Sequence, residues 1–371
     1  MDHVAEIYHE LGRLQEAEAL QSVFSEKRKT ILGEDHPATL TAMGNLAKTY
    51  HQLGRLQEAG PLQFLVLKKR RTILGGDHPS TLTAMIHLAG TYRRLGRMQE
   101  AEALQRAVLE KQRTTLGEEH SQTLTTMNSL AMTYQHLGRV LEAEALQIVV
   151  FKKQKTILGE DHPETLRAMG NLANTYLQLG RLQEAEALQS VVFEKAKIIL
   201  GEDHPETLTA MNNLAETYHQ LGRLQEAEKL QSVVFQKQKT ILGEDHPHTL
   251  IAMGDLAEIY CGLGRLQAAK ELQSVIFKKQ RTILGEDHPH TLISMGNLAS
   301  TYWQPSQLQE AEALGTVVFE KPKTIFREDH QDTLITMSHL AETYSRLGRV
   351  QEAEALRQGT HSLSGNNISV I

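Results

Sequence analysis

The amino-acid sequence predicts an all-α protein, an α-solenoid of about nine antiparallel helix pairs. Three observations predict it: a period of 42 residues, apolar stripes at helical spacing inside each period, and a glycine after most of the expected helices. All tyrosines of the chain stand at one phase of this period: Tyr8, Tyr50, Tyr92, Tyr134, Tyr176, Tyr218, Tyr260, Tyr302 and Tyr344. No insertion or deletion breaks the frame, so we expect a fold built from stacked copies of one repeat.

The first helix of each repeat follows from one apolar stripe. In the second repeat, Leu40, Met43, Ala47 and Tyr50 recur at spacings of three and four residues, which places them on one side of a helix. Gly54 is expected to end this helix, because glycine adopts the left-handed conformation at little cost.

The second helix of the same repeat follows from another stripe. This stripe begins with Leu56, Ala59, Leu62 and Val66, and Gly75 ends the helix. A single helix pair cannot bury both of its apolar sides, so each repeat is expected to pack against the next one.

A short joint, Asp77-His78-Pro79, connects one repeat to the following one. Proline fits the first turn of a helix, and either Asp77 or His78 can cap the helix that Pro79 begins. Basic residues such as Lys68 and Lys69 gather at the end of each second helix, where they complement the helix dipole. We interpret these basic runs as a solvated face.

The frame assigns residues 1–358 to the array and leaves 359–371 as a disordered tail. The expected repeats are 1–35 (partial), 36–77, 78–119, 120–161, 162–203, 204–245, 246–287, 288–329 and 330–358 (partial). The eighth repeat is degenerate, because Pro305 replaces a leucine and Pro322 falls inside the second helix. We therefore expect a bend or soft spot near residues 303–327.

Composition argues against several classes of function. The net charge of −6 is mild, which disfavours generic binding of nucleic acid. With one cysteine, Cys261, the chain cannot form a disulfide framework or a cysteine-based zinc site, and a reducing compartment is expected. No apolar stretch approaches the ~18 residues of a membrane helix. We therefore expect a cytoplasmic protein with no cofactor, no metal, no membrane contact and no nucleic-acid partner.

Histidine recurs at the joints, but in a pattern that does not suit a metal site. Copies of one position in stacked repeats lie roughly 10 Å or more apart, so they cannot share one ion. We interpret these histidines as helix caps. The chain has no Gly-x-x-x-x-Gly-Lys-Ser/Thr loop, and no variable position gathers a nucleophile, a base and an orienting group. An enzyme is therefore not expected.

The segment Leu46-Ala47-x-x-Tyr50, followed by Ala59, resembles the central signature of tetratricopeptide repeats. The 42-residue length, the Gly-Glu-Asp-His-Pro joint and the Asn-Leu-Ala of the first helix resemble the repeats of kinesin light chains. They resemble still more the C-terminal arrays of fungal NACHT or NB-ARC receptor-like proteins. The resemblance covers residues 1–358 and implies a right-handed superhelix that binds a protein or an extended peptide.

The resemblance also implies that the first helices line a concave groove, where the asparagine of Asn-Leu-Ala binds peptide backbone. An amide suits this role because it can donate to a carbonyl and accept from an N–H at once. The groove candidates are Asn45, Asn171, Asn213 and Asn297 at this position, with Lys48, Asn174 and Arg167 nearby. An equal alternative is that these residues face solvent and vary freely.

The expected groove changes charge along the chain. Its basic residues all belong to the first five repeats: Lys48, Arg93, Arg94 and Arg167. Acidic residues follow at Glu216, Asp255 and Glu258. We therefore expect no carboxylate-rich ligand beyond the fifth repeat.

These patterns favour a non-enzymatic scaffold that binds a protein or peptide. Two alternatives stay open: the ligand-sensing arm of a fungal NLR-like signalling NTPase, truncated here, and a cargo adaptor of the kinesin light chain type. Neither end has a polar capping helix, so end-to-end self-association is a further expectation.

Overall fold

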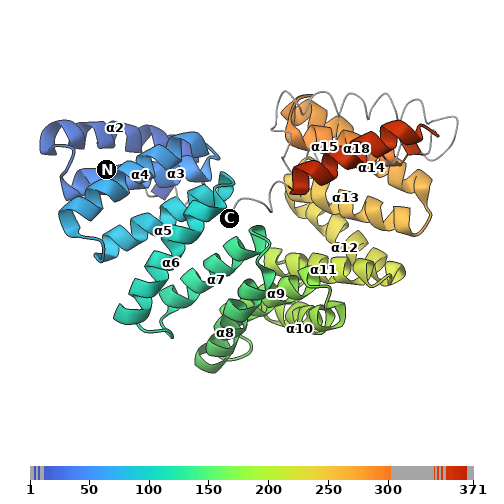
Figure 1. Cartoon of the computed structure of the whole chain (residues 1–371), viewed down its shortest axis with the longest axis horizontal. Helices are drawn as coiled ribbons and strands as arrows, with labels where there is room; N and C mark the ends of the chain where they lie inside the picture. Colours follow the sequence, from blue (N-terminus) through green and yellow to red (C-terminus); the bar gives the residue numbers. More distant parts are fainter. Residues whose placement is uncertain are drawn as a thin grey trace. The chain divides into compact units, whose positions relative to one another are not determined.

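The computed structural model describes residues 12–301 and 348–365, together with 4–5, 7–8, 338, 341 and 344–345. All regular structure in these residues is α-helical, as predicted (Figure 1). The helices are α2 (Leu14–Leu32), α3 (Pro37–Gln52), α4 (Leu56–Leu74), α5 (Pro79–Arg94), α6 (Met98–Thr115), α7 (Ser121–His136), α8 (Val140–Leu158), α9 (Pro163–Gln178), α10 (Leu182–Leu200), α11 (Pro205–Gln220), α12 (Leu224–Leu242), α13 (Pro247–Gly262), α14 (Leu266–Leu284), α15 (Pro289–Ser300) and α18 (Val350–Gly365).

From α2 to α15, even-numbered helices are the second helices of repeats and odd-numbered helices are the first helices. The chain divides into two compact halves, Met1–Leu188 and Gln189–Ile371. Within the first half, each helix from α2 to α9 packs on its neighbours in the sequence. Within the second half, the helices from α11 to α15 pack in the same order. This stacking of sequential helix pairs confirms the predicted α-solenoid.

Two expectations concern the C-terminal part of the chain. The soft spot near residues 303–327 lies outside the described residues. Helix α18 runs from Val350 to Gly365 and so continues past residue 358, where the repeat frame ends.

A histidine caps each first helix from α3 to α15. At α5, His78 Nδ1 accepts a hydrogen bond from the backbone N–H of Ser80 at 3.1 Å. Asp77, the other residue that could have been the cap, forms an ion pair with Lys111 at 2.9 Å instead. The cap requires a neutral imidazole, because Nδ1 can accept a hydrogen bond only when it is unprotonated.

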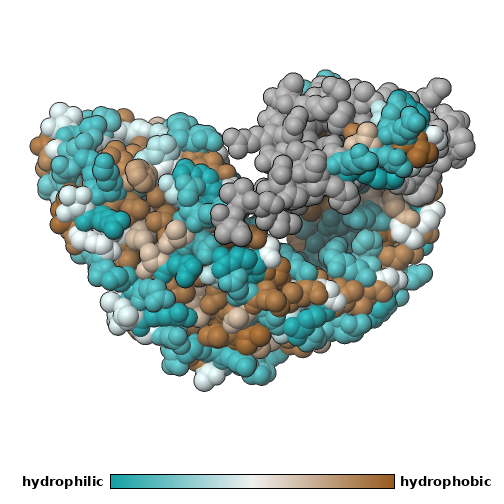
Figure 2. Space-filling view, in the orientation of Figure 1, coloured by the Kyte–Doolittle hydropathy of each residue, from teal (hydrophilic) through white to brown (hydrophobic). Residues whose placement is uncertain are grey.

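Small and aliphatic side chains form a core that extends along the stack. Ala47 on α3 and Ala59 on α4 are fully buried, which lets paired helices approach closely. Leu40, Met43 and Val66 belong to one core cluster. On the coloured part of the face in Figure 2, hydrophilic residues alternate with apolar patches. The core is therefore distributed between neighbouring repeats, as nearest-neighbour stacking requires.

The repeated tyrosine packs against the arginine that follows its helix. Arg55 Cζ lies 4.5 Å from the centre of the Tyr50 ring, and Arg55 also pairs with Glu18 of the preceding repeat at 2.7 Å. The same stacking on tyrosine recurs at Arg13, Arg97, Arg139, Arg181, Arg223, Arg265 and Arg349. This cation–π contact holds the turn between the two helices of a repeat.

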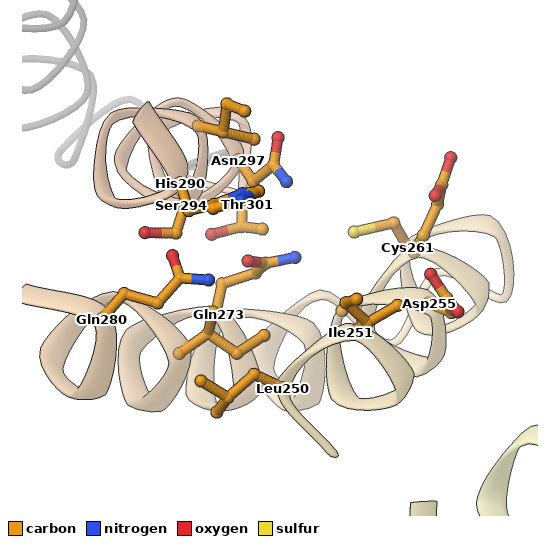
Figure 3. Close-up of a pocket in the computed structure, with 14 residues that line it drawn as sticks. Leu250, Ile251, Asp255, Cys261, Gln273, Gln280, His290, Ser294, Asn297 and Thr301 are labelled. Carbon is orange, nitrogen blue, oxygen red and sulfur yellow. The ribbon is translucent and has the colours of Figure 1, made fainter. Parts of the chain in front are cut away.

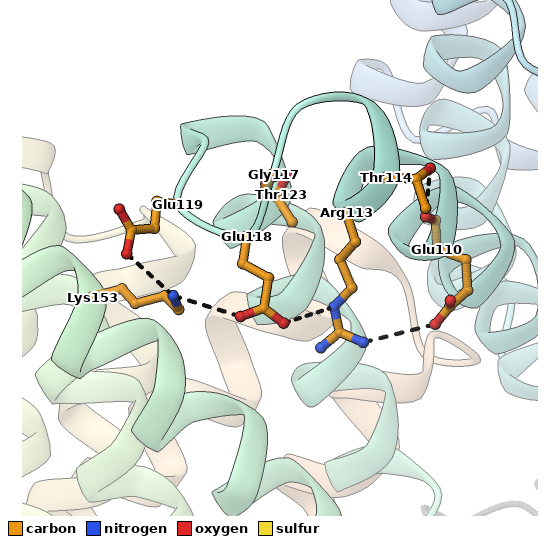
Figure 4. A network of polar contacts seen from close by, with 8 residues as sticks. All are labelled: Glu110, Arg113, Thr114, Gly117, Glu118, Glu119, Thr123 and Lys153. Carbon is orange, nitrogen blue, oxygen red and sulfur yellow. Dashed lines mark hydrogen bonds and ion pairs between the residues drawn. The ribbon is translucent and has the colours of Figure 1, made fainter.

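Ion pairs link neighbouring repeats at the joints. Lys69 on α4 pairs with Asp35 at 2.5 Å, and the equivalent ion pair recurs at Lys111–Asp77, Lys237–Asp203 and Lys279–Asp245. In Figure 4, Lys153 lies 3.5 Å from one oxygen of Glu118, and Arg113 lies 3.5 Å from the other. Within the basic runs, which were interpreted as a solvated face, one lysine therefore bridges two repeats through an exposed acid.

Candidate functional site

Each half of the chain contains a cavity between two successive first helices. In the first half, α5 and α7 enclose about 660 Å³, with α6 contributing side chains from the intervening second helix. In the second half, α13 and α15 enclose about 380 Å³, with α14 in the intervening place (Figure 3). Both cavities are therefore built by first helices, the elements that the sequence associates with binding.

The two cavities occupy the same positions of the repeat, four repeats apart. Twelve of the fourteen residues that line the α13–α15 cavity have an equivalent, 168 residues earlier, that lines the α5–α7 cavity. Leucine and glutamine are unchanged at three of these positions: Leu82 and Leu250, Gln105 and Gln273, Gln112 and Gln280. The repeat thus encodes a pocket with a constant frame.

Three variable positions carry different charges in the two cavities. His87, Gly90 and Arg93 of the first cavity correspond to Asp255, Glu258 and Cys261 of the second: each pair stands 168 residues apart. A basic or neutral residue is thereby replaced by an acid or a thiol on the same side of the first helix.

The α5–α7 cavity contains two basic side chains, the half-buried Arg93 and the more exposed His87. Burial lowers the pKa of the Arg93 guanidinium, whose Nη1 lies 3.6 Å from Met132 Sδ. Burial also lowers the pKa of His87, and the nearby charges of Lys48 and Arg70 lower it further. Arg93 therefore supplies a positive charge at this cavity, while His87 favours its neutral form.

The α13–α15 cavity contains a partly buried acid. Burial raises the pKa of Asp255 to about 6, the charges of Glu216 and Glu258 add to the increase, and a hydrogen bond with Asn212 opposes it. Burial, with a contribution from Glu258, also raises the pKa of the Cys261 thiol.

Buried glutamines on the second helices support these cavities from inside. Thr133 Oγ1 donates to Gln105 Oε1 at 2.8 Å, and the same bond joins Thr175 to Gln147 and Thr217 to Gln189. This series was not predicted from the sequence. The available signal was a glutamine at a fixed phase inside the apolar stripe, with a threonine 28 residues later in most repeats.

Three of these glutamines depart from the pattern. Gln63 Oε1 and Thr91 Oγ1 are both buried without a hydrogen-bond partner, so this pair does not form the bond. Ile259 stands where other repeats have threonine, and Gln231 Nε2 instead donates to Asn212 Oδ1 at 2.9 Å and to Asp255 Oδ2 at 3.3 Å. Gln273 is 6% exposed and has no hydrogen-bond partner among the described residues. Figure 3 shows its amide directed into the α13–α15 cavity.

The structure distributes the seven groove candidates unevenly. Asn297 lines the α13–α15 cavity. Asn171 Nδ2 donates to Asn128 Oδ1 on the preceding first helix at 3.1 Å, so its amide is already engaged. The remaining five lie on first helices: Asn45 and Lys48 are exposed on α3, Asn174 is half-buried and Arg167 exposed on α9, and Asn213 is half-buried on α11.

Two further properties concern the described residues as a whole. Among them, no three His, Cys, Asp or Glu side chains are grouped so that they could hold a metal ion. None of the helices described is both long and apolar enough to cross a membrane.

Family models described as tetratricopeptide repeat match most of the chain. One model matches residues 1–61, 80–147 and 122–197, and another matches 207–248, 249–290 and 333–358. No curated protein sequence matches the chain.

Several solved structures are similar. One, from Podosopora anserina, consists of kinesin light chain-like, nearly identical TPR-like repeats. Its sequence is 34% identical to this one, and the match covers 55% of this chain and 97% of that chain with a TM-score of 0.49. The quorum sensor NprR of B. thuringiensis is 15% identical in sequence, and the match covers 94% of both chains with a TM-score of 0.67. A Rap protein complexed with Competence and Sporulation Factor is 13% identical in sequence, and the match covers 99% of this chain and 97% of that chain with a TM-score of 0.64. The last two similarities concern the fold.

Proposed function

Because the chain belongs to the tetratricopeptide repeat family, we propose that it is a non-enzymatic scaffold that binds a protein segment or an extended peptide along its first helices. The observation that carries this proposal is the recurrence of one cavity at equivalent positions of two repeats. A repeated pocket with constant Leu and Gln and variable neighbours suits a ligand that is itself a chain of varied side chains. The Rap protein of the same fold holds another molecule, Competence and Sporulation Factor.

The chemistry of the cavities favours binding over catalysis. The residues that would have to act on a substrate change between the two copies, since Arg93 is replaced by Cys261 and His87 by Asp255. The raised pKa of the Cys261 thiol disfavours the thiolate, which is the nucleophilic form. The single cysteine also suits a reducing compartment, and we include a cytoplasmic location in the proposal.

More specific roles belong to the same proposal. A ligand-sensing arm of a fungal signalling NTPase and a kinesin-light-chain-like cargo adaptor both require a peptide-binding array. End-to-end association of two arrays is compatible with either role. The groove residues are proposed as Asn45, Asn171, Asn213, Asn297, Lys48, Asn174 and Arg167.

Blocking the cavities tests this function. A Cβ at Gly90 would meet no atom within 4 Å, and at Gly254 only Ile276 Cδ1 at 3.9 Å. The double variant Gly90→Phe/Gly254→Phe therefore fills both cavities while the helices remain. We expect the natural chain, but not this variant, to enrich sequences from a phage-displayed library of random dodecapeptides.

The control places the same aromatic group elsewhere on the array. Glu271→Phe adds it to an exposed position of α14 and is expected to leave the enrichment unchanged. Equal enrichment by the blocked variant, with circular dichroism showing an intact helical fold, would overturn the proposed binding surface.

A further inference from the structure

We propose that the cavity between α13 and α15 binds the cationic side chain of an arginine or lysine within a peptide. This inference rests on the proposed peptide-binding function and specifies the chemistry of one of its pockets. With about 380 Å³, the cavity is at the lower end of the ~300–1,000 Å³ typical of ligand pockets, which suits one long side chain.

The first argument is charge. Asp255 and Glu258 line the cavity, and Glu216 is near enough to Asp255 to influence its ionisation. Neither lysine nor arginine is among the described residues that line it. The equivalent cavity four repeats earlier has no acid at these positions and contains Arg93. The acidic character is therefore a property of this repeat and not of the frame.

The second argument is an unsatisfied amide at the same cavity. Gln273 is 6% exposed, and no described residue forms a hydrogen bond with its side chain. Its equivalent, Gln105, accepts from Thr133 Oγ1 at 2.8 Å and donates to Ser129 O at 3.3 Å. In the α13–α15 repeat, Thr301 Oγ1 instead donates to Leu298 O at 2.7 Å. Gln280 Oε1 lines the same cavity and is buried without a hydrogen-bond partner, which is unfavourable. A ligand that donates to Gln280 Oε1 relieves that cost.

The third argument is that Asp255 is held in place. Gln231 donates to its Oδ2 at 3.3 Å, but a carboxylate has room for about four hydrogen bonds, so acceptor capacity remains. Ammonium and guanidinium groups are donors only. An arginine or lysine side chain would thus find in one cavity two carboxylates that complement its charge and an amide oxygen without a donor.

Four synthetic pools of random, acetylated and amidated nonapeptides test this pocket. Their central residue is arginine, lysine, citrulline or glutamate, and citrulline has the shape of arginine without its charge. The amount of each pool retained by the immobilised full chain is measured. We expect the arginine and lysine pools to be retained at least about threefold more than the citrulline pool, and the glutamate pool least.

Two variants with a matched control assign the selectivity to the cavity. Asp255→Asn/Glu258→Gln keeps the shape of the two side chains and removes their charge. It should reduce retention of the arginine and lysine pools to that of the citrulline pool. Glu271→Gln removes one charge from an exposed position of α14 and should change nothing. His87→Asp/Gly90→Glu/Arg93→Cys transfers the acidic set to the α5–α7 cavity, where a Cβ at Gly90 has free space, and should increase retention of the arginine pool.

The outcomes separate this inference from the function on which it rests. Retention of no pool above the level of Gly90→Phe/Gly254→Phe would overturn both. Equal retention of the arginine and citrulline pools, or selectivity that survives Asp255→Asn/Glu258→Gln, would overturn the cationic pocket alone. Preference for arginine over lysine would identify a guanidinium site, and the reverse an ammonium site, both in agreement with the proposal.

Discussion

Gln231 Nε2 on α12 donates a hydrogen bond to Asp255 Oδ2 on α13 at 3.3 Å, which couples a buried glutamine of one repeat to the acid of the next cavity. This bond stabilises the ionised carboxylate, so removing the donor should raise the pKa of Asp255 further. We expect carboxyl ¹³C NMR titration of Gln231→Leu to show a pKa above that of the natural chain. Gln189→Leu removes the equivalent glutamine one repeat earlier and should leave the pKa of Asp255 unchanged.

The threonine–glutamine pair of other repeats should matter to stability. In Thr175→Val the Thr175 hydroxyl no longer donates to Gln147 Oε1, a buried acceptor. An unsatisfied buried acceptor costs about 1–3 kcal/mol, and we expect that loss in the opening free energy of α8 and α9, measured by hydrogen exchange. Gln147→Met/Thr175→Val should cost less than Thr175→Val alone. The exposed change Thr156→Val should stay within about 0.5 kcal/mol.

The helices and their order could be predicted from the sequence, because the 42-residue frame repeats the same apolar stripes and glycines. The choice between Asp77 and His78 as cap could not. In the structure His78, directly before Pro79, is the cap, and Asp77 pairs with Lys111 of the following repeat. Local sequence names the residues able to cap a helix, but it does not contain this contact between repeats.

The candidate site was predictable in phase but not in detail. The Asn-Leu-Ala position lines both cavities, as His87 and Ser129 in one and as Asp255 and Asn297 in the other. That Asn171 donates to Asn128 depends on the distance between two first helices, which a linear pattern does not contain. The glutamine series was missed because glutamine is usually exposed, although its constant phase in an apolar stripe indicated burial.

The histidine caps predict a specific effect at α11. His204 Nδ1 accepts from the backbone N–H of Glu206 at 3.2 Å, so His204→Ala leaves this N–H without its acceptor. Loss of a cap costs about 1 kcal/mol, and hydrogen exchange in the first turn of α11 should become faster. His204→Asn restores a side-chain acceptor and should remain close to the natural chain. Equal effects of the two substitutions would contradict a capping role.

Two glycines around the end of α5 should respond oppositely to alanine. Gly90 lies inside the helix with free space around its Cβ position, so Gly90→Ala should stabilise α5 by up to about 1 kcal/mol. Gly96 has φ +76°, a conformation that alanine adopts only with strain, so Gly96→Ala should destabilise it by about 1 kcal/mol or more. Thermal unfolding followed by circular dichroism measures both, and a shift of the same sign would contradict this assignment.

Asp255 predicts a pH dependence of local stability in α13. Its folded pKa of about 6 is above the ordinary 3.8, so the unfolded carboxyl ionises first as pH rises. The contribution of the Asp255 carboxyl to the stability of the folded state is greatest below the ordinary pKa. It decreases between the unfolded and the folded pKa, and it is fully lost above about 6. Above pH 7, Asp255→Asn should therefore stabilise α13 by up to about 3 kcal/mol, and below pH 4 the two proteins should converge in stability.

The ratio of the hydrogen-exchange rates of the two proteins at each pH measures this difference in stability, because intrinsic exchange rates cancel. Glu216, Glu258 and His219 also act on Asp255, but all three are present in both proteins. A ratio that does not change with pH would show that Asp255 ionises normally.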